Sequence, residues 1–168
     1  MTNAHIILIG MMGSGKTTVG QAVSRAYGIP FTDTDALIEK RLNMTIPRIF
    51  EQYGESYFRE QEAKAARIAV AESKAAVIAT GGGIVTIPKT MALFKQSGFV
   101  VYLQLSLDDL QKRTANDQNR PLQSRMEELL IKRRSLYTKY SDLILDGAAP
   151  ADKLSEMIWN EYRSYKRA

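Results

Sequence analysis

Residues 10–17, GMMGSGKT, have the spacing of a phosphate-binding loop, G-x-x-x-x-G-K followed by serine or threonine. The apolar run 5–9 before them predicts a buried strand, and residues 16–27 predict a helix. The glycines permit a tight turn whose N–H groups converge on an anion at the positive end of that helix. Lys16 adds a charge for the β- and γ-phosphates, and the Thr17 hydroxyl can bind Mg²⁺. A glycine-rich turn with a chance lysine is the alternative, but the flanking strand and helix favour nucleoside triphosphate binding.

Two carboxylates, Asp33 and Asp35, follow a second predicted strand at residues 29–32 and precede a predicted helix at 36–42. In extended chain, side chains two residues apart point to the same side. Beside Mg·ATP, one carboxylate can hold the metal, directly or through water, while the other orients an acceptor hydroxyl for in-line attack. A turn that caps the following helix is the alternative, since aspartate is common there. The position after the second strand favours the functional interpretation.

Three consecutive glycines, Gly81, Gly82 and Gly83, follow a third predicted strand at residues 75–79. Because they carry no side chains, they allow the backbone to approach a ligand closely. A plain flexible turn is the alternative, but three glycines exceed what one turn needs. No acidic residue closes this strand, so the metal-binding role falls on Asp33.

Several arginines are candidates for binding anionic groups. Arg59 precedes Glu62 by three residues, so a guanidinium held by that carboxylate could present its fork to a substrate carboxylate. An exposed salt bridge is the alternative. Arg120 lies in a polar stretch, where an arginine could swing over the transferring phosphate. Arg133 and Arg134 lie in a predicted helix, and spacing alone does not decide whether either faces the site or is surface charge.

Composition narrows the class of protein. The chain has 168 residues, enough for one domain with a good core, and 45% apolar and 24% charged residues are ordinary for a globular protein. The absence of cysteine excludes disulfides and a thiol nucleophile, and His5 is the single histidine. The net charge of +5 comes from basic residues gathered at 112–134 and 163–167, which ATP and an anionic substrate explain better than nucleic acid. No membrane span or signal pattern is visible, so we expect a cytoplasmic protein.

The predicted strands alternate with predicted helices, which indicates an α/β fold with a parallel sheet. The later strands are expected at 99–103 and 142–145. The later helices are expected at 45–53, ended by Gly54, and at 55–73, 88–97, 107–114, 125–140 and 151–165. Ligands of such sheets bind beyond the carboxyl ends of the strands. The phosphate-binding loop, the aspartates and the glycines all follow strands, so we expect them to gather at one edge.

Taken together, the ordered motifs resemble those of the shikimate kinases. They run from G-x-x-G-x-G-K-T through D-T-D, Y-F-R-x-x-E, G-G-G, R-T and R-P-L to R-x-x-L-Y, and they span nearly the whole chain. The resemblance implies a three-layer P-loop kinase fold, with a five-stranded parallel sheet in order 2-3-1-4-5, helices on both faces and a mobile lid. It implies one domain over residues 1–168, with substrate-binding helices at about 34–62 and the lid at about 115–124.

Matched residue by residue, the resemblance implies three sets of ligands. The ATP-binding set is Gly13, Ser14, Gly15, Lys16, Thr17, Thr18, Arg113, Arg120 and Pro150. The substrate-binding set is Asp35, Phe50, Phe58, Arg59, Glu62, Gly81, Gly82, Gly83 and Arg133. Mg²⁺ would lie near Thr17 and Asp33. Within these sets, Asp35 would orient the acceptor hydroxyl, and Lys16 and Arg120 would neutralise charge on the transferring group.

The implied activity is transfer of the ATP γ-phosphoryl group to the 3-hydroxyl of shikimate, with Mg²⁺ as cofactor. We expect a monomer that binds ATP and shikimate, and neither nucleic acid nor membrane. Two alternatives stay open at this point. One is another small-molecule kinase, acting on gluconate or a nucleoside monophosphate, and the other is a non-catalytic regulator that binds nucleotide.

Overall fold

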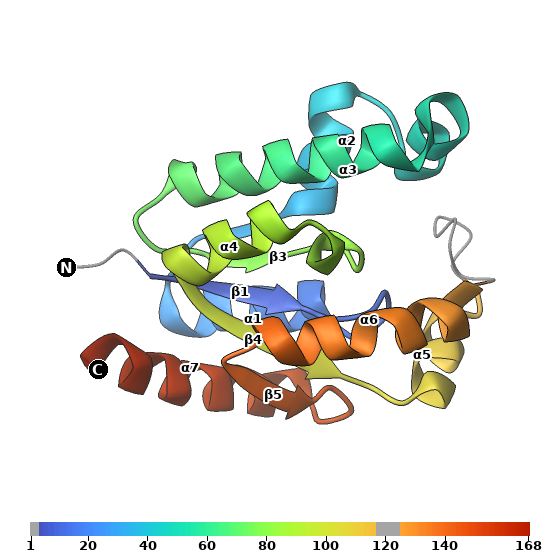
Figure 1. Ribbon diagram of the computed structural model, residues 1–168. Coiled ribbons are helices and arrows are strands. Elements are labelled where there is room, and N and C mark those ends of the chain that lie inside the picture. The colour runs from blue at the N-terminus through green and yellow to red at the C-terminus, as the bar shows by residue number, and fades with distance from the viewer. Residues whose placement is uncertain (1–3, 117–124) are drawn as a thin grey trace.

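Five parallel strands form the centre of the computed structural model, which describes residues 4–116 and 125–168 (Figure 1). The strands lie in the order β2-β3-β1-β4-β5, and every neighbouring pair is parallel. They are β1 (His5–Ile9), β2 (Phe31–Asp33), β3 (Val77–Ala79), β4 (Gly98–Gln104) and β5 (Leu143–Asp146). The α/β class and the strand order implied by the resemblance are confirmed.

Helices cover both faces of this sheet. They are α1 (Lys16–Tyr27), α2 (Thr34–Leu42), α3 (Ile46–Glu72), α4 (Pro88–Ser97), α5 (Leu107–Thr114), α6 (Met126–Tyr140) and α7 (Ala151–Arg167), with a 3-10 turn, η1 (Ile84–Thr86). None of the described helices is long and apolar enough to cross a membrane.

The alternation of side chains along β1 explains the two layers. Ile6 and Leu8 pack with the buried faces of α1 and α7, whereas Ile7 and Ile9 pack on the opposite face with α4, α5, α6 and the end of α3. All five residues of β1 are buried, as expected for the central strand of a parallel sheet. The apolar side chains of β1 therefore belong alternately to the two hydrophobic cores on either face of the sheet.

A third and smaller core joins α2 to α3, which lie together at the top of Figure 1. Its buried members are Ile38, Ile49, Phe58 and Ala65. This cluster fixes the two helices to each other. It is the scaffold for the side chains that enter the site from residues 34–62, and the assignment of that segment as the substrate-binding part stays a prediction.

The start of α2 differs from the prediction. The helix begins at Thr34, and Asp33 caps it, because its Oδ1 accepts hydrogen bonds from the backbone N–H groups of Asp35 (2.9 Å) and Ala36 (3.2 Å). Residues 33–35 are therefore not extended throughout, and the expectation that strand alternation directs both carboxylates was wrong. Asp33 thus caps the helix, as the alternative interpretation expected, but both carboxylates line one cleft, and their functional roles stay a prediction.

The predicted break at Gly54 is confirmed, but in a different form. Gly54 has φ 80° and ψ 176° inside α3, so the helix kinks there and continues without an intervening loop. This backbone conformation is available almost only to glycine. Ser106 caps α5 as predicted, through a hydrogen bond from the N–H of Asp109. The turn η1 was not predicted, and strand bounds shift by one or two residues. The predicted lid lies largely outside the described residues.

Candidate functional site

Lys16 is the first residue of α1, and its side chain reaches back over the loop that precedes the helix. Its Nζ donates to the carbonyl oxygens of Gly10 (2.7 Å) and Met11 (2.8 Å) and to Ser14 Oγ (3.4 Å). Gly10, Gly13 and Gly15 have positive φ angles, which wrap the loop around the ammonium group. The loop is therefore formed in the protein itself and directed toward the carboxyl edge of the sheet.

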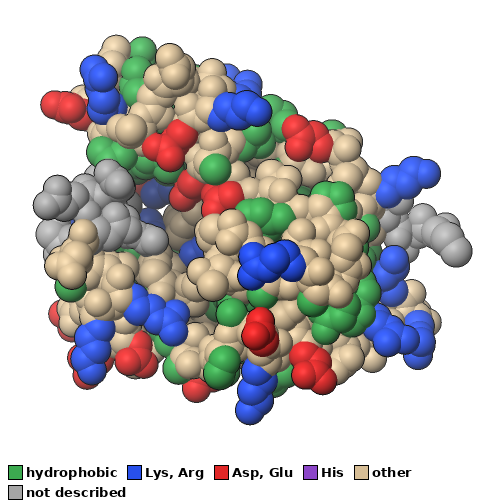
Figure 2. All heavy atoms as spheres, turned by 180° about the vertical axis from the view of Figure 1, so that it is seen from behind, with side chains coloured by type: hydrophobic (Ala, Val, Ile, Leu, Met, Phe, Trp, Pro, Cys, Tyr) green, Lys and Arg blue, Asp and Glu red, His purple; other side chains and the backbone are tan. Residues whose placement is uncertain are grey.

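A cleft of about 350 Å³ opens beside this loop and appears as a hollow with basic and acidic side chains in Figure 2. It is lined by Met12, Gly13, Gly15, Lys16, Thr17, Thr18, Asp33, Asp35, Glu39, Ile46, Phe50, Phe58, Arg59, Glu62, Thr80, Gly81, Gly82, Gly83 and Arg133. Every residue of the predicted substrate set is among them. The prediction that motifs from three strand ends converge is confirmed.

The cleft contains oxygen atoms suited to Mg²⁺. Thr17 Oγ1 donates to Asp33 Oδ2 at 2.7 Å, while Asp33 Oδ1 caps α2. Magnesium is commonly held by one or two carboxylates together with substrate phosphates and water, so this hydroxyl–carboxylate pair fits the ion. The described residues contain no group of three or more acidic or histidine side chains that would form an all-protein metal cage.

Asp35 is half-buried and lines the cleft, but its Oδ1 is shielded from solvent and has no hydrogen-bond partner among the described residues. Burial and, to a lesser extent, the nearby carboxylates of Glu62, Asp33 and Glu39 raise its pKa, the charge of Lys16 opposes them, and the resulting pKa is about 7. A carboxyl group with an unused oxygen and a pKa near neutrality can accept a hydrogen bond, or a proton, from an acceptor hydroxyl.

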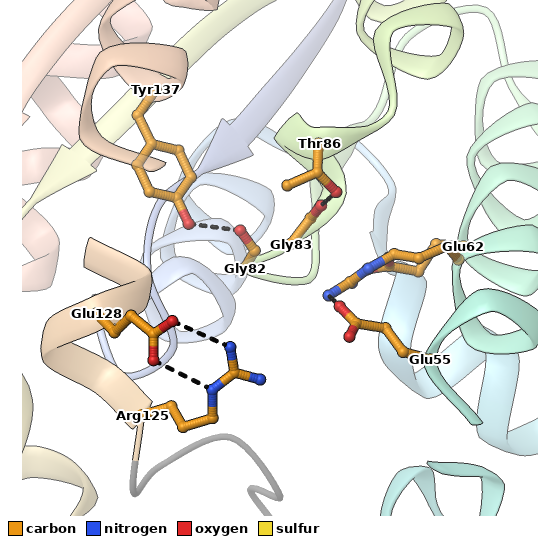
Figure 3. Close-up of polar contacts among 9 residues, drawn as sticks. Glu55, Glu62, Gly82, Gly83, Thr86, Arg125, Glu128 and Tyr137 are labelled. Atoms are coloured by element: carbon orange, nitrogen blue, oxygen red, sulfur yellow. Dashed lines mark hydrogen bonds and ion pairs between the residues drawn. The ribbon is translucent and has the colours of Figure 1, made fainter. Parts of the chain in front are cut away.

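Arg59 is held between two carboxylates of its own helix. Its guanidinium donates to Glu62 Oε2 at 2.6 Å and to Glu55 Oε1 at 3.0 Å, and the second contact is visible at Glu55 in Figure 3. The Arg59 side chain is only 15% exposed and that of Glu62 is fully buried, so this is not the exposed salt bridge of the alternative interpretation. Burial raises the pKa of Glu62, and the two arginines Arg59 and Arg133 oppose that shift.

Gly81 and Gly83 are glycines because side chains from α2 and α3 fill the space beside them. A Cβ on Gly83 would lie 2.2 Å from Arg59 Nη1, and a Cβ on Gly81 would lie 2.6 Å from Glu62 Oε1 and 2.8 Å from Asp35 Oδ1. The predicted close approach thus includes the protein's own functional side chains. We call residues 81–83 the glycine shelf.

The carbonyl oxygens of the glycine shelf are all engaged within the protein. Gly81 O accepts from the N–H of Ile84 at 3.2 Å, and Gly83 O accepts from the Thr86 hydroxyl at 2.7 Å. The Tyr137 hydroxyl donates to Gly82 O, and Figure 3 shows both hydroxyls directed at the shelf. Among the described residues, the N–H groups of the shelf donate no such hydrogen bond, so they can contact a bound substrate.

The two candidate arginines, Arg133 and Arg134, lie on different faces of α6. Arg133 is 4% exposed and lines the cleft, with its Nη1 beside Gly82, whereas Arg134 is exposed. The residue matched by the resemblance is therefore the one that faces the site. The helix turn between residues 133 and 137 also brings Tyr137 to the glycine shelf.

A second cavity of about 460 Å³ adjoins the other side of the loop. Arg113 and Pro150, both predicted to flank adenine, line it together with Gly147. Arg113 donates to Gly13 O (3.4 Å) and to Gly147 O (3.1 Å), so it joins the phosphate-binding loop to the segment after β5. The Ser14 side chain lines neither cavity, because it is buried beside Lys16.

Some residues of the cleft were not predicted, and one predicted residue lies outside the described ranges. Glu39 is one helical turn after Asp35 on α2, so helical spacing could have identified it. Met12, Ile46 and Thr80 also line the cleft, but their sequence context carried no chemical signal. Arg120, the predicted lid arginine, is outside the part of the chain that the structure describes.

Comparison with known proteins agrees over almost the whole chain. The profile of the shikimate kinase family matches residues 12–163. A shikimate kinase of Bordetella avium is 38% identical over 96% of this chain and 80% of its own length, and one of Thioalkalivibrio sulfidiphilus is 40% identical over 97% and 87%. The solved structure of a shikimate kinase from Acinetobacter baumannii in complex with shikimate has a TM-score of 0.91 and 35% identity, covering 97% of this chain and 94% of that one.

The matched region contains the lining residues of both cavities, residues 12–17 of the phosphate-binding loop, the aspartates and the glycine shelf. The architecture, the order of the motifs and the extent of the similarity lead to one conclusion. The chain belongs to the shikimate kinase family, a family of ATP-dependent phosphotransferases.

Proposed function

We propose that this protein transfers the γ-phosphoryl group of Mg·ATP to the 3-hydroxyl of shikimate, giving shikimate 3-phosphate and ADP. One observation carries the proposal. A single cleft holds the unpartnered carboxyl of Asp35 and the guanidinium groups of Arg59 and Arg133 opposite Lys16 of the phosphate-binding loop. A compact ring with a carboxylate and a nearby hydroxyl matches that distribution of charge.

The donor would lie across the loop. Backbone N–H groups at the start of α1 and the ammonium of Lys16 would hold the phosphates, and Arg113 and Pro150 would flank the base in the second cavity. Thr17 and Asp33 would hold Mg²⁺. When bound, the ion supplies charge neutralisation at the β- and γ-oxygens.

The acceptor would lie between α3 and the glycine shelf. Arg59 and Arg133 would bind its carboxylate, the shelf N–H groups would contact its polar groups, and Phe50 and Phe58, 4.7 Å apart between ring centres, would wall its ring. Asp35 would accept a hydrogen bond from the attacking hydroxyl. Because phosphoryl transfer has a loose transition state, orientation by Asp35 contributes more than its basicity.

A coupled assay of ADP release tests the proposal. Purified protein is given Mg·ATP with shikimate, gluconate or a nucleoside monophosphate, and then shikimate with EDTA in excess over Mg²⁺. Of the three acceptors, only shikimate should stimulate ADP release, and EDTA should abolish that stimulation. Stimulation by gluconate or a nucleoside monophosphate instead would assign another small-molecule kinase. If the protein binds nucleotide but no acceptor stimulates ADP release, it would be the non-catalytic regulator of the second alternative.

A further inference from the structure

We propose that Tyr137 is a positioning residue that sets the separation between the bound donor and the bound acceptor. The inference rests on the proposed function and adds a role for a side chain that lines neither cavity. One hydroxyl on α6 touches both the acceptor's shelf and the donor's loop.

The first contact is with the glycine shelf. The Tyr137 hydroxyl donates to Gly82 O (Figure 3), the middle carbonyl of the shelf. Burial raises the pKa of Tyr137 well above its ordinary value, so the hydroxyl stays protonated and available as a donor. The ring is fully buried and stacks on Tyr102 with 4.9 Å between ring centres. The stack restrains the ring that carries the hydroxyl, and the guanidinium of Arg133 also interacts with this hydroxyl.

The second contact is with the phosphate-binding loop. The same hydroxyl lies 3.5 Å from the sulfur of Met11, whose carbonyl oxygen accepts from Lys16 Nζ at 2.8 Å. Gly82 also packs directly on this loop, because a Cβ there would lie 3.2 Å from the N of Met12 and 3.6 Å from Gly10 O. The glycine shelf and the phosphate-binding loop therefore meet at Gly82, and the Tyr137 hydroxyl contacts both of them there.

This junction lies where catalysis is most sensitive to distance. The shelf would contact the polar groups of the acceptor, whose attacking hydroxyl Asp35 would orient, and the loop would hold the γ-phosphate. In-line transfer requires the reacting atoms to be held about 3–3.5 Å apart, and a displacement of about 1 Å can lower the rate a hundredfold. A defect in Tyr137 should consequently appear in kcat rather than in the affinity for either ligand alone.

The test compares Tyr137→Phe with Tyr102→Phe. Tyr137→Phe keeps the buried ring and its stack but removes the hydroxyl at the junction, whereas Tyr102→Phe removes a hydroxyl from the other ring of the same stack. We measure kcat for shikimate-stimulated ADP release, the Kd of ADP alone, the Kd of shikimate alone by calorimetry, and Tm. Tyr137→Phe should lower kcat about tenfold while each Kd changes less than about threefold, and Tyr102→Phe should keep kcat within about twofold.

A double-mutant cycle with Met11→Leu tests the link to the loop. Leucine nearly conserves the volume of methionine but lacks the sulfur that the Tyr137 hydroxyl contacts. If the hydroxyl acts through both contacts, the two substitutions should lower kcat less than additively on a logarithmic scale. Strict additivity would overturn the bridge between the two sites.

The remaining outcomes are decisive as well. An unchanged kcat in Tyr137→Phe, or an equal loss in Tyr102→Phe, would overturn the positioning role while leaving the proposed function intact. A loss confined to the Kd of shikimate would also overturn it, since that result places Tyr137 in acceptor binding alone. Absence of shikimate-stimulated turnover in the wild-type protein would refute the proposed function first, and the inference with it.

Discussion

Arg59 enters the cleft already paired with Glu62 and Glu55, so its orientation is set before any substrate arrives. Such pre-organisation lowers the cost of binding a carboxylate, and a charge-assisted pair contributes about 1.5–3 kcal/mol. We therefore expect Arg59→Ala to raise the KM for shikimate roughly 10- to 100-fold while the KM for ATP changes less than about threefold. Steady-state kinetics with each substrate varied in turn measures both values.

Arg48 supplies the matched control for this substitution. It is an exposed arginine on the same helix and does not line the cleft, so Arg48→Ala should leave both KM values near those of the wild type. Equal increases for shikimate and ATP in Arg59→Ala would contradict the assignment of Arg59 to the acceptor carboxylate.

Asp35 gives the free protein a specific dependence of stability on pH. Its pKa is raised from 3.8 to about 7 on folding, so the folded state binds the proton more tightly than the unfolded chain. The stabilisation by this proton is complete below about pH 4 and is lost as the pH rises through about 7. In metal-free and ligand-free protein, Asp35→Asn should gain stability relative to the wild type over this interval, by about 1–4 kcal/mol.

Urea denaturation at several pH values between 4.5 and 7.5 measures that gain. The variant keeps Glu62, whose pKa burial also raises, so the difference between the two proteins isolates Asp35. A free-energy difference that stays constant over this range would show that Asp35 is not protonated in the folded protein. In the ADP-release assay, the same variant should lose turnover while it still binds nucleotide.

At the scale of the element, the kink at Gly54 lies between residues of α3 that line the cleft. Phe50 precedes it, and Phe58 and Arg59 follow it. A Cβ on Gly54 would meet no other atom within 4 Å, so Gly54→Ala acts through backbone strain alone. We expect a loss of about 1–3 kcal/mol in stability and a rise of several-fold in the KM for shikimate.

Gly28, the C-cap of α1, is the natural comparison. It has φ 68°, and a Cβ there would also meet no atom within 4 Å, but it lies outside both cavities. Gly28→Ala should lower Tm in thermal denaturation, or the free energy of unfolding in urea, without changing the KM for shikimate. Similar KM changes in both variants would mean that general destabilisation, and not the angle of α3, sets acceptor binding.

At the scale of the whole molecule, the two cavities lie on either side of one loop and should respond to separate substitutions. A ligand present at 100 times its Kd stabilises the folded state by about 2.7 kcal/mol, which raises Tm by several degrees for a chain of this size. Arg113→Ala should reduce the Tm shift produced by ADP and preserve that produced by shikimate. Arg59→Ala should have the opposite effect. Thermal-shift measurements with each ligand alone distinguish the two patterns, and a loss of both shifts in either variant would contradict the separation.

Much of this architecture follows from local signals in the sequence. The strand at residues 5–9, the glycines of the loop and the cap at Ser106 depend on nearest neighbours, and the structure confirms them. The start of α2 was misjudged because the Asp33 side chain replaces a backbone partner, which strand periodicity does not report. The contact of Tyr137 with Gly82 joins residues 55 positions apart, so only the folded chain reveals it.

The double use of Asp33 has a consequence for how the two roles can be separated. One carboxylate oxygen begins a helix, and the other faces the Thr17 hydroxyl where the metal would lie. An asparagine retains an oxygen able to accept from the backbone but lacks the charge that attracts a cation. Asp33→Asn should accordingly preserve Tm and raise the Mg²⁺ concentration needed for half-maximal rate. Asp33→Ala should both lower Tm and raise that Mg²⁺ concentration. The two substitutions at one position thus distinguish an effect on folding from an effect on Mg²⁺ binding.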